Sequence, residues 1–400
     1  MTDTVAFPQG RTCPYQPAPG YEPLAGQRPL AEATLYDGRR VWAVTSRDVA
    51  RRLLVDPRIS SDRTNPAWPM MFPIIAATVS DIQQKVMKIV TALVGVDGAV
   101  HSARRKMLIP SFTIRRINAM RPKIQRIVDE QLDRMLERGA PADLIEEFAA
   151  PVPVTVLYRL MGIPDDEHEY FETMSHQLAA GPNANEAYDE LMAYMSKLIA
   201  DKQRNPGETV LDDLLAEHAA GDMDHEELVS TLVLQVAGGH GTTGTMISLG
   251  MFTLLQYPEQ LAELRADPSL MPTAVDELLR LLSIPDGVSR LATDDIEVEG
   301  TTIRKGDGVF FITSLINRDS AVHDAPGSLG LHRTSARDHV SFGFGAHQCL
   351  GQNLARVTME IALGTLIERL PGLRLAALPE EVPFNPTAGF QVLTELPVTW

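Results

Sequence analysis

One stretch near the carboxyl end of the chain restricts the fold more than any other, and it reads HVSFGFGAHQCLGQNLARVTMEIALGTLIERL. After the cysteine, apolar residues recur at helical spacing, which places on one helix face Leu350, Leu354, Val357 and Ile361. The first four residues predict a short strand, and a glycine-containing loop joins this strand to the helix. The pattern therefore predicts that Cys349 lies at the amino end of a helix.

This position favours one chemical form of the Cys349 sulfur. The helix dipole and the unpaired amides of a first helical turn stabilise a thiolate, which is the form that binds metal ions. Gly343 and Gly351 remove side chains where the backbone would have to approach a flat ligand. A lone cysteine without such neighbours is more often a buried structural thiol, so both interpretations are open at this point.

Composition excludes several other kinds of protein. The chain has only two cysteines, Cys13 and Cys349, which provide neither a disulfide framework nor a four-cysteine zinc site. A net charge of -16 argues against a nucleic-acid-binding protein. The amino terminus lacks the pattern of a signal peptide, and no apolar stretch is convincing as a membrane span. We therefore expect a cytoplasmic protein that binds neither membrane nor nucleic acid.

Most of the remaining chain has the periodicity of helices. Helices are predicted over residues 113–138, 142–161, 184–203 and 225–256. Short β-hairpin patterns occur in ATLYDGRRVWAVT, which has an Asp-Gly turn, and in IEVEGTTIRKGDGVFFIT, where a Glu-Gly turn and a Gly-Asp-Gly turn separate β-prone arms. With 400 residues, 44% of them hydrophobic, the chain can bury a large core. The predicted fold class is mainly α with small β-sheets (α+β).

The helix predicted over residues 225–256 has a weak centre, AGGHGTTG, at residues 237–244. Each glycine inside a helix costs roughly 1 kcal/mol relative to alanine. Four glycines at the middle of one helix therefore indicate a purpose other than helix stability.

A second unusual stretch is HSARRKMLIPSFTIRRINAMRPKIQR, residues 101–126, which carries basic residues and no carboxylate. Such a run is explained either as a solvated helical face or as a docking surface for an acidic partner. The residues alone leave both explanations open.

The string Phe342-Gly343-x-Gly345-x-His347-x-Cys349-Leu350-Gly351 resembles the heme-binding signature of the cytochrome P450 family, and LAR at 354–356 continues it. The resemblance extends from about Phe7 to the carboxyl terminus and is closest to soluble actinobacterial members. It implies a single cytochrome P450 domain over residues 1–400, with a long distal helix over the heme and the cysteine loop beneath it. It also implies heme b (iron protoporphyrin IX) as the cofactor and Cys349 as the axial iron ligand.

The same resemblance assigns further site residues. The family's buried Glu-x-x-Arg pair corresponds to Glu277 and Arg280, with Arg333 as a third member. Contacts to the heme propionates are implied for His101, Arg105, Arg290 and His347, and Phe342, Gly343 and Gly351 belong to the cofactor loop. The segment VDGAVH, which ends at His101, departs from the family's usual two prolines and glutamate.

In the distal helix, the family usually carries an acid followed by threonine, and both help to deliver protons to dioxygen. In this chain Thr242 occupies the position of the family's threonine, and Gly241 occupies the position of the acid. General acid catalysis is typically worth about two to four powers of ten, so this departure matters. His240 precedes the gap, and histidine is the side chain that ordinarily titrates near neutrality, but neighbouring helix residues point about 100° apart, so it need not face the oxygen.

The resemblance implies a monooxygenase that inserts one atom of dioxygen into an apolar small molecule, and the expected substrates are natural products of secondary metabolism. Its electrons would come from NAD(P)H through a ferredoxin reductase and a ferredoxin, and the enzyme is expected to be a monomer. The Gly241 departure keeps an alternative open, namely peroxide-driven, nitric-oxide or ring-forming oxidative coupling chemistry on the same heme. A non-catalytic heme-binding sensor is a more remote alternative. The substrate-lid positions are residues 65–94 and, more loosely, 171–194 and 389–393.

Overall fold

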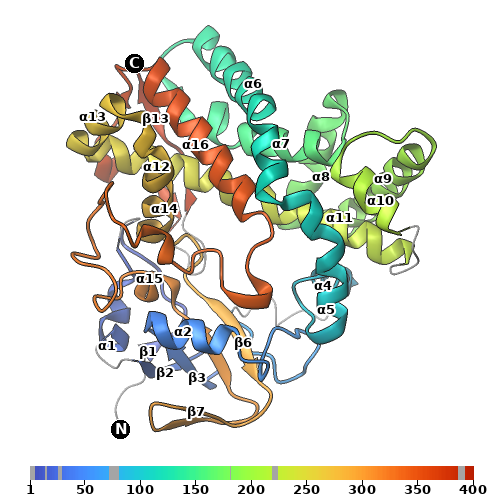
Figure 1. Cartoon of the computed structure of the whole chain (residues 1–400), viewed down its shortest axis with the longest axis vertical. Helices are drawn as coiled ribbons and strands as arrows, with labels where there is room; N and C mark the ends of the chain where they lie inside the picture. Colours follow the sequence, from blue (N-terminus) through green and yellow to red (C-terminus); the bar gives the residue numbers. More distant parts are fainter. Residues whose placement is uncertain are drawn as a thin grey trace.

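The computed structural model describes residues 5–13, 16–25, 29–71, 81–180, 182–218, 224–385 and 392–400. Long helices make up most of this part of the chain, and the strands form small sheets, so the predicted fold class is confirmed. In Figure 1 most of the strands gather at one end of the molecule beside α1 (Glu22–Ala25) and α2 (Arg47–Leu54), and the long helices fill the other end.

The Asp-Gly hairpin forms as predicted. Strands β2 (Leu30–Thr34) and β3 (Arg40–Val44) pair antiparallel, and Gly38 between them has a φ of 81°. This positive φ suits glycine, which lacks the Cβ that crowds the left-handed conformation. The hairpin belongs to a sheet with the order β1-β2-β3-β9-β6-β4. Its other strands are β1 (Val5–Ala6), β4 (Ile59–Ser60), β6 (Val288–Ala292) and β9 (Gly308–Phe311).

The second β-rich segment divides between two sheets. Strands β7 (Ile296–Val298) and β8 (Thr301–Ile303) form a hairpin at the Glu-Gly turn. The next strand, β9, leaves this hairpin and pairs with β3 and β6. All four residues of β9 are buried, so they need the centre of a sheet covered on both faces.

The helices, with two short sheets among them, position the site. The longer helices are α4 (Asp81–Thr91), α5 (Gly98–Leu108), α6 (Ile114–Arg138), α7 (Pro151–Met161), α8 (His168–Ala180), α9 (Ala184–Arg204), α10 (Val210–His218), α11 (His225–His240), α12 (Thr242–Gln256), α13 (Pro258–Ala266), α14 (Met271–Leu282) and α16 (Gln352–Arg369), and α15 (Thr313–Ile316) is short. The remaining strands are β5 (Ala142–Asp143), β10 (Arg374–Leu375), β11 (Phe384–Asn385), β12 (Val392–Leu393) and β13 (Pro397–Thr399). Within the described ranges, no helix is both long enough and apolar enough to span a membrane.

Two local predictions were wrong. The helix predicted over 142–161 begins only at Pro151, after strand β5 and a π-helical turn, Ile145–Ala149. Proline lacks an amide hydrogen and is tolerated in the first helical turn, so Pro151 and Pro153 mark a helix start. The short strand predicted for HVSF does not form, because the Val340 amide donates to the Asn317 side chain and the Ser341 amide to His339.

A continuous apolar core connects the helices that frame the site. Helix α16 packs against α6, α12 and α14, and Figure 1 shows it running beside α6. Gly250 of α12 permits close approach, since a Cβ there would lie 3.3 Å from Leu278 of α14 and 3.5 Å from Leu363 of α16. This packing fixes where α16 begins and where α12 crosses the molecule. It therefore sets the two walls between which the candidate site lies.

Candidate functional site

The loop before α16 is held by its own backbone. The amide of Cys349 donates to the Phe342 carbonyl at 2.8 Å, and the amide of Gln348 donates to the Gly345 carbonyl at 3.1 Å. Gly343 and Gly345 have φ values of 69° and 74°, which disfavour any residue with a side chain. A Cβ on Gly345 would also lie only 2.7 Å from the Leu54 carbonyl oxygen, so the loop is pressed against the end of α2.

Cys349 lies just ahead of α16, whose N-cap residue is Gly351. Its side chain has accessible surface, yet protein atoms surround the sulfur densely enough that burial raises the pKa of the thiol. Hydrogen bonds from the amides of Gly351 and Gln352, and the charges of Arg105 and Arg356, lower this pKa but do not outweigh burial. The amides at the start of α16 therefore favour the thiolate, as the sequence predicts, but burial opposes them and is the larger influence. Burial by itself favours the neutral thiol, whereas a directly bound cation would favour the thiolate.

Small and aromatic residues shape the surroundings of the sulfur. A Cβ on Gly351 would lie 4.0 Å from the Cys349 sulfur, so glycine leaves that side open. The Arg356 guanidinium carbon lies over the Phe342 ring, 4.7 Å from the ring centroid. The loop thus presents one sulfur and little else to a ligand that approaches it.

The four residues assigned to propionate binding come together from separate elements. The rings of His101, from α5, and His347, from the cysteine loop, have centroids 4.0 Å apart. Arg105 donates to the Gln348 carbonyl at 2.6 Å, and Arg290 of β6 donates to the Ser289 carbonyl at 2.8 Å. Burial, together with the charges of His347, Arg105 and Arg290, lowers the pKa of His101 to about 4. The group is electrostatically coupled and mainly basic.

Arg63 joins this group, although no sequence pattern indicated it. Burial lowers the pKa of Arg63, and burial together with the charge of Arg63 lowers the pKa of Arg290 to about 10. Arg63 is also placed over the Trp68 ring, 5.7 Å from its centroid. Across the described ranges, neither arginine forms an ion pair with a carboxylate of the chain. Arg63 keeps solvent exposure and Arg290 is half-buried, and two neighbouring cations without a carboxylate partner repel each other, so the arrangement fits a ligand that carries carboxylates, as heme does.

Asp97 is the second residue that sequence reasoning missed. One carboxylate oxygen lies 2.8 Å from His347 Nε2, and the other accepts hydrogen bonds from Ser60 Oγ at 2.5 Å and the Ser61 amide at 2.8 Å. Burial would raise the pKa of Asp97, but these hydrogen bonds prevail and lower it to about 2. Asp97 precedes α5, so it ties the cysteine loop to β4 and to the helix that carries His101.

On the opposite wall, the long helix is interrupted where the sequence is weakest. Helix α11 ends at His240, α12 begins at Thr242, and Gly241 between them has φ and ψ of -96° and -31°. The helical hydrogen-bond pattern resumes immediately, since the Thr245 amide donates to the Gly241 carbonyl at 2.9 Å.

The glycines of this junction serve two purposes. A Cβ on Gly239 would lie 2.9 Å from Leu157, and one on Gly244 would lie 2.7 Å from the Ala149 carbonyl oxygen. These two glycines let the helix pack closely against α7 and the turn before it. A Cβ on Gly238 or Gly241 would meet nothing within 4 Å. These positions are three apart and share a face, which leaves room on that side of the helix.

Thr242 borders the same open face. Its hydroxyl makes a long hydrogen bond of 3.3 Å to the Gly238 carbonyl, one helical turn earlier. The hydroxyl is exposed and weakly held, so it can exchange this partner for water or a ligand. The side chain of His240 lies outside the described part of the chain. Its proposed contribution to proton delivery is thus a prediction that the geometry does not address.

Glu277, Arg280 and Arg333 form a buried ionic cluster. Arg280 donates to the two carboxylate oxygens of Glu277 at 2.7 and 2.8 Å, and Arg333 Nε donates to Glu277 at 2.9 Å. The side chains of Glu277 and Arg280 are completely buried. Arg280 also donates to the carbonyls of Asn317 and Pro326. The cluster therefore fastens the segment that precedes the cysteine loop to α14.

Comparisons with known proteins agree with this geometry. The Cytochrome P450 family model matches residues 178–372. Pentalenic acid synthase of Streptomyces avermitilis is 54% identical over 400 residues, which are 99% of this chain and 97% of that protein. Vitamin D3 dihydroxylase of Streptomyces griseolus is 46% identical over 405 residues, covering 100% of this chain and 98% of the relative. The crystal structure of CYP105D6 has a TM-score of 0.88 at 44% identity and covers 99% and 98% of the two chains.

The chain belongs to the cytochrome P450 family, and it is of the actinobacterial type. It is accordingly a heme-thiolate monooxygenase, which uses redox partners, dioxygen and an organic substrate. The cysteine loop and the basic group around His101 fit that cofactor on chemical grounds.

Proposed function

We propose that this enzyme inserts one oxygen atom from dioxygen into an apolar natural product, with electrons supplied by a ferredoxin and its reductase. The observation that carries the proposal is the juxtaposition of the Cys349 sulfur with a basic group in which Arg63 and Arg290 form no ion pair with a carboxylate of the described residues. The names of the relatives support the substrate class. They refer to pentalenic acid, to vitamin D3 and to 20-oxo-5-O-mycaminosyltylactone.

The residues of this chain have separate tasks. When bound, the heme supplies the activation of dioxygen. Cys349 provides the sulfur ligand, and the Gly351 and Gln352 amides donate to it, which disperses its negative charge. Contacts to the two propionates come from His101, Arg105, Arg290 and His347, to which we add Arg63.

On the distal side, Gly238 and Gly241 leave space, and Thr242 carries a hydroxyl beside that face. Thr242 holds a proton on Oγ1 and can turn from the Gly238 carbonyl toward the reacting centre. Because Gly241 supplies no acid, the proton that Thr242 passes on must be replaced from water or from a hydroxyl of the substrate. This route retains monooxygenase chemistry without the usual carboxylate.

The assignment is tested by the spectrum of the reduced protein with carbon monoxide. A thiolate-ligated heme has a red-shifted Soret band, and its absence would overturn the assignment. NADH-driven turnover with a surrogate ferredoxin pair should exceed peroxide-driven turnover. A protein that works only with peroxide would instead support the alternative raised by Gly241.

Substrate identity is best sought through binding spectra with a panel of polyketides, terpenoids, steroids and peptides. Of the lid positions, residues 72–80, 181 and 389–391 lie outside the described residues, whereas Trp68 is buried and Phe171 packs against Tyr158 and Tyr194. We also propose a monomeric, cytoplasmic protein in which residues 1–400 form one domain. Size-exclusion chromatography with light scattering tests the monomer.

A further inference from the structure

The basic run at residues 101–126 does not form one surface. His101 and Arg105 face the heme site, as described above. Three other cations are paired, Arg104 with Glu227, Arg116 with Asp213 and Arg121 with Glu360. Four exposed cations form no ion pair within the described part of the chain, and these are Lys106, Arg115, Lys123 and Arg126. The last three of them line one groove.

The groove lies between α6, α7 and the segment that leads into α10, and it has a volume of about 770 Å³. Five basic and two acidic side chains line it. The whole chain carries a net charge of -16, so this groove is a local reversal of sign. Its volume lies within the range of sites for small organic molecules, roughly 300–1,000 Å³.

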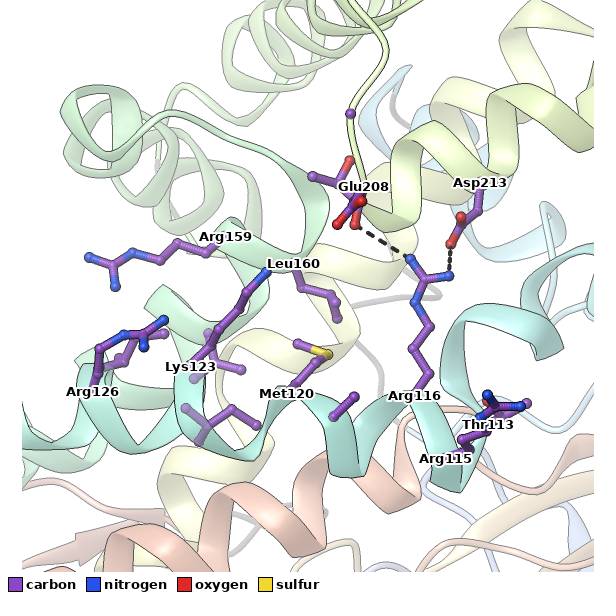
Figure 2. A pocket seen from close by; sticks show the side chains of 16 residues that line it. Thr113, Arg115, Arg116, Met120, Lys123, Arg126, Arg159, Leu160, Glu208 and Asp213 are labelled. Atoms are coloured by element: carbon purple, nitrogen blue, oxygen red, sulfur yellow. Dashed lines mark hydrogen bonds and ion pairs between the residues drawn. The ribbon is translucent and has the colours of Figure 1, made fainter.

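The two ends of the groove differ (Figure 2). Lys123, Arg126 and Arg159 lie at one end, and their charged groups come from two helices. At the other end Arg116 donates to the Glu208 carbonyl at 3.5 Å and pairs with Asp213 at 2.5 Å. The first end therefore suits anionic groups, and the second offers both donors and acceptors.

Apolar side chains connect the two ends. Met120 and Leu160 lie between them in Figure 2, and the lining also includes buried Ile124, Ile127 and Val156. An inorganic anion would make no use of this floor, because its hydration is lost without compensation there. An organic body would bury its apolar surface on the floor while its charges reach the basic end.

Arg159 has carboxylate neighbours, Asp165 at 3.0 Å and Glu130 at 3.2 Å. Both carboxylates are at least 46% exposed. Arg159 donates to both oxygens of Asp165, and such a bidentate pair is stronger than an ordinary exposed ion pair, which contributes about 0–1 kcal/mol. Lys123 and Arg126 form no ion pair within the described ranges, so they supply the main attraction for an anion, and Arg159 adds to it. Lys123 and Arg126 are one helical turn apart on α6, so all three cations can contact one multivalent group.

We propose that this groove binds an organic polyanion, an apolar body that carries several phosphate or carboxylate groups at the Lys123–Arg126–Arg159 end. The site is separate from the heme site and independent of the substrate that the enzyme oxidises. Charge at one end and an apolar floor in the middle make both parts of such a ligand necessary for tight binding.

The experiment is isothermal titration calorimetry of the heme-loaded protein with three probes. ATP carries both an aromatic body and a triphosphate, tripolyphosphate carries only charge, and adenosine carries only the body. We expect ATP to bind at least tenfold more tightly than either of the others. Reversing two charges, Lys123→Glu with Arg126→Glu, should weaken ATP binding at least tenfold, whereas Met120→Gln should weaken ATP binding but leave tripolyphosphate binding unchanged.

The matched control reverses two exposed charges elsewhere, Arg265→Glu on α13 with Lys305→Glu, and changes net charge equally. An unchanged carbon monoxide spectrum and melting temperature establish that each variant is folded. Equal weakening by the control and groove variants would reduce the effect to overall charge and overturn the proposal. The proposal is also overturned if tripolyphosphate binds as tightly as ATP, or if ATP at millimolar concentration causes no measurable heat.

Discussion

The cysteine loop and the distal helix junction are both rich in glycine, but their glycines do opposite things. In the loop, Gly343 and Gly345 have positive φ, and Gly345 is pressed against the Leu54 carbonyl. At the junction, Gly241 has an ordinary helical conformation and empty space where a side chain would be. The comparison teaches that glycine in the loop permits a left-handed backbone and a close contact that a side chain would disfavour. Glycine at the junction leaves room for reacting molecules.

We expect the largest effect from replacing Cys349, the proposed sulfur ligand in the cysteine loop. Cys349→Ser removes the sulfur, so we expect the red-shifted carbon monoxide band to disappear and substrate oxidation to fall to background. Cys13→Ser, the control at the other cysteine, should leave both unchanged. A Cys349→Ser protein that retains the band would contradict the role of this residue.

The second prediction concerns the support behind the loop. Glu277→Gln leaves the buried Arg280 without its charge partner, and breaking a buried pair typically costs about 3–5 kcal/mol. Chemical unfolding monitored by circular dichroism measures the loss. The control is the exposed pair of Arg204 with Asp201, where Asp201→Asn should change stability by less than about 1 kcal/mol. Equal losses would show that burial of the cluster is unimportant.

The same substitution in the two regions tests the comparison most directly. Gly345→Ala forces a side chain into a left-handed conformation and against a carbonyl, so it should destabilise the protein by about 2–4 kcal/mol. Gly241→Ala should be neutral or stabilise by up to about 1 kcal/mol, because alanine is the better helix former and nothing obstructs its Cβ. If thermal unfolding ranks the two variants in the reverse order, the distinction between the regions fails.

Filling the open junction with an acid tests its chemistry. Gly241→Glu or Gly241→Asp restores a carboxylate beside Thr242, and we expect release of hydrogen peroxide per NADH consumed to change severalfold. Gly241→Gln is the uncharged control of similar size. Unchanged peroxide release in the acidic variants would contradict a link between the missing acid and proton delivery.

The smallest predicted effect depends on pH. Asp97 has a pKa lowered to about 2, against an ordinary value near 3.9, so it stabilises the folded protein fully above about pH 4. This contribution is lost as pH falls from about 4 through 2, because the unfolded carboxylate takes up its proton first. The free energy of unfolding should therefore decrease more between pH 5 and pH 3 in the wild type than in Asp97→Asn. Equal decreases would contradict the assignment.

Much of the site could be predicted because it depends on local patterns. The motif around Cys349 and the Glu277–Arg280 pair are short local patterns, and their chemistry can be inferred without knowing the fold. The start of α7 and the absent strand at HVSF were predicted wrongly, because partners distant in the chain decide them. Asn317 takes the Val340 amide that a neighbouring strand would have used.

Arg63 and Asp97 were missed for the same reason. Each is an ordinary charged residue in a loop, and nothing in its neighbours along the chain marks it. Their importance comes from elements that only folding brings close, namely β6 for Arg63 and the cysteine loop for Asp97.

The sequence by itself determined the family and predicted the sulfur ligand and the place of the missing acid, because each depends on residue types at fixed spacing. Only the tertiary structure decided which basic residues of 101–126 are paired, which face the heme site and which line a groove. The tertiary structure also distinguished the glycines that allow close helix packing from those that leave open space. The physical reason is that charge pairing and room for a side chain depend on neighbours in space.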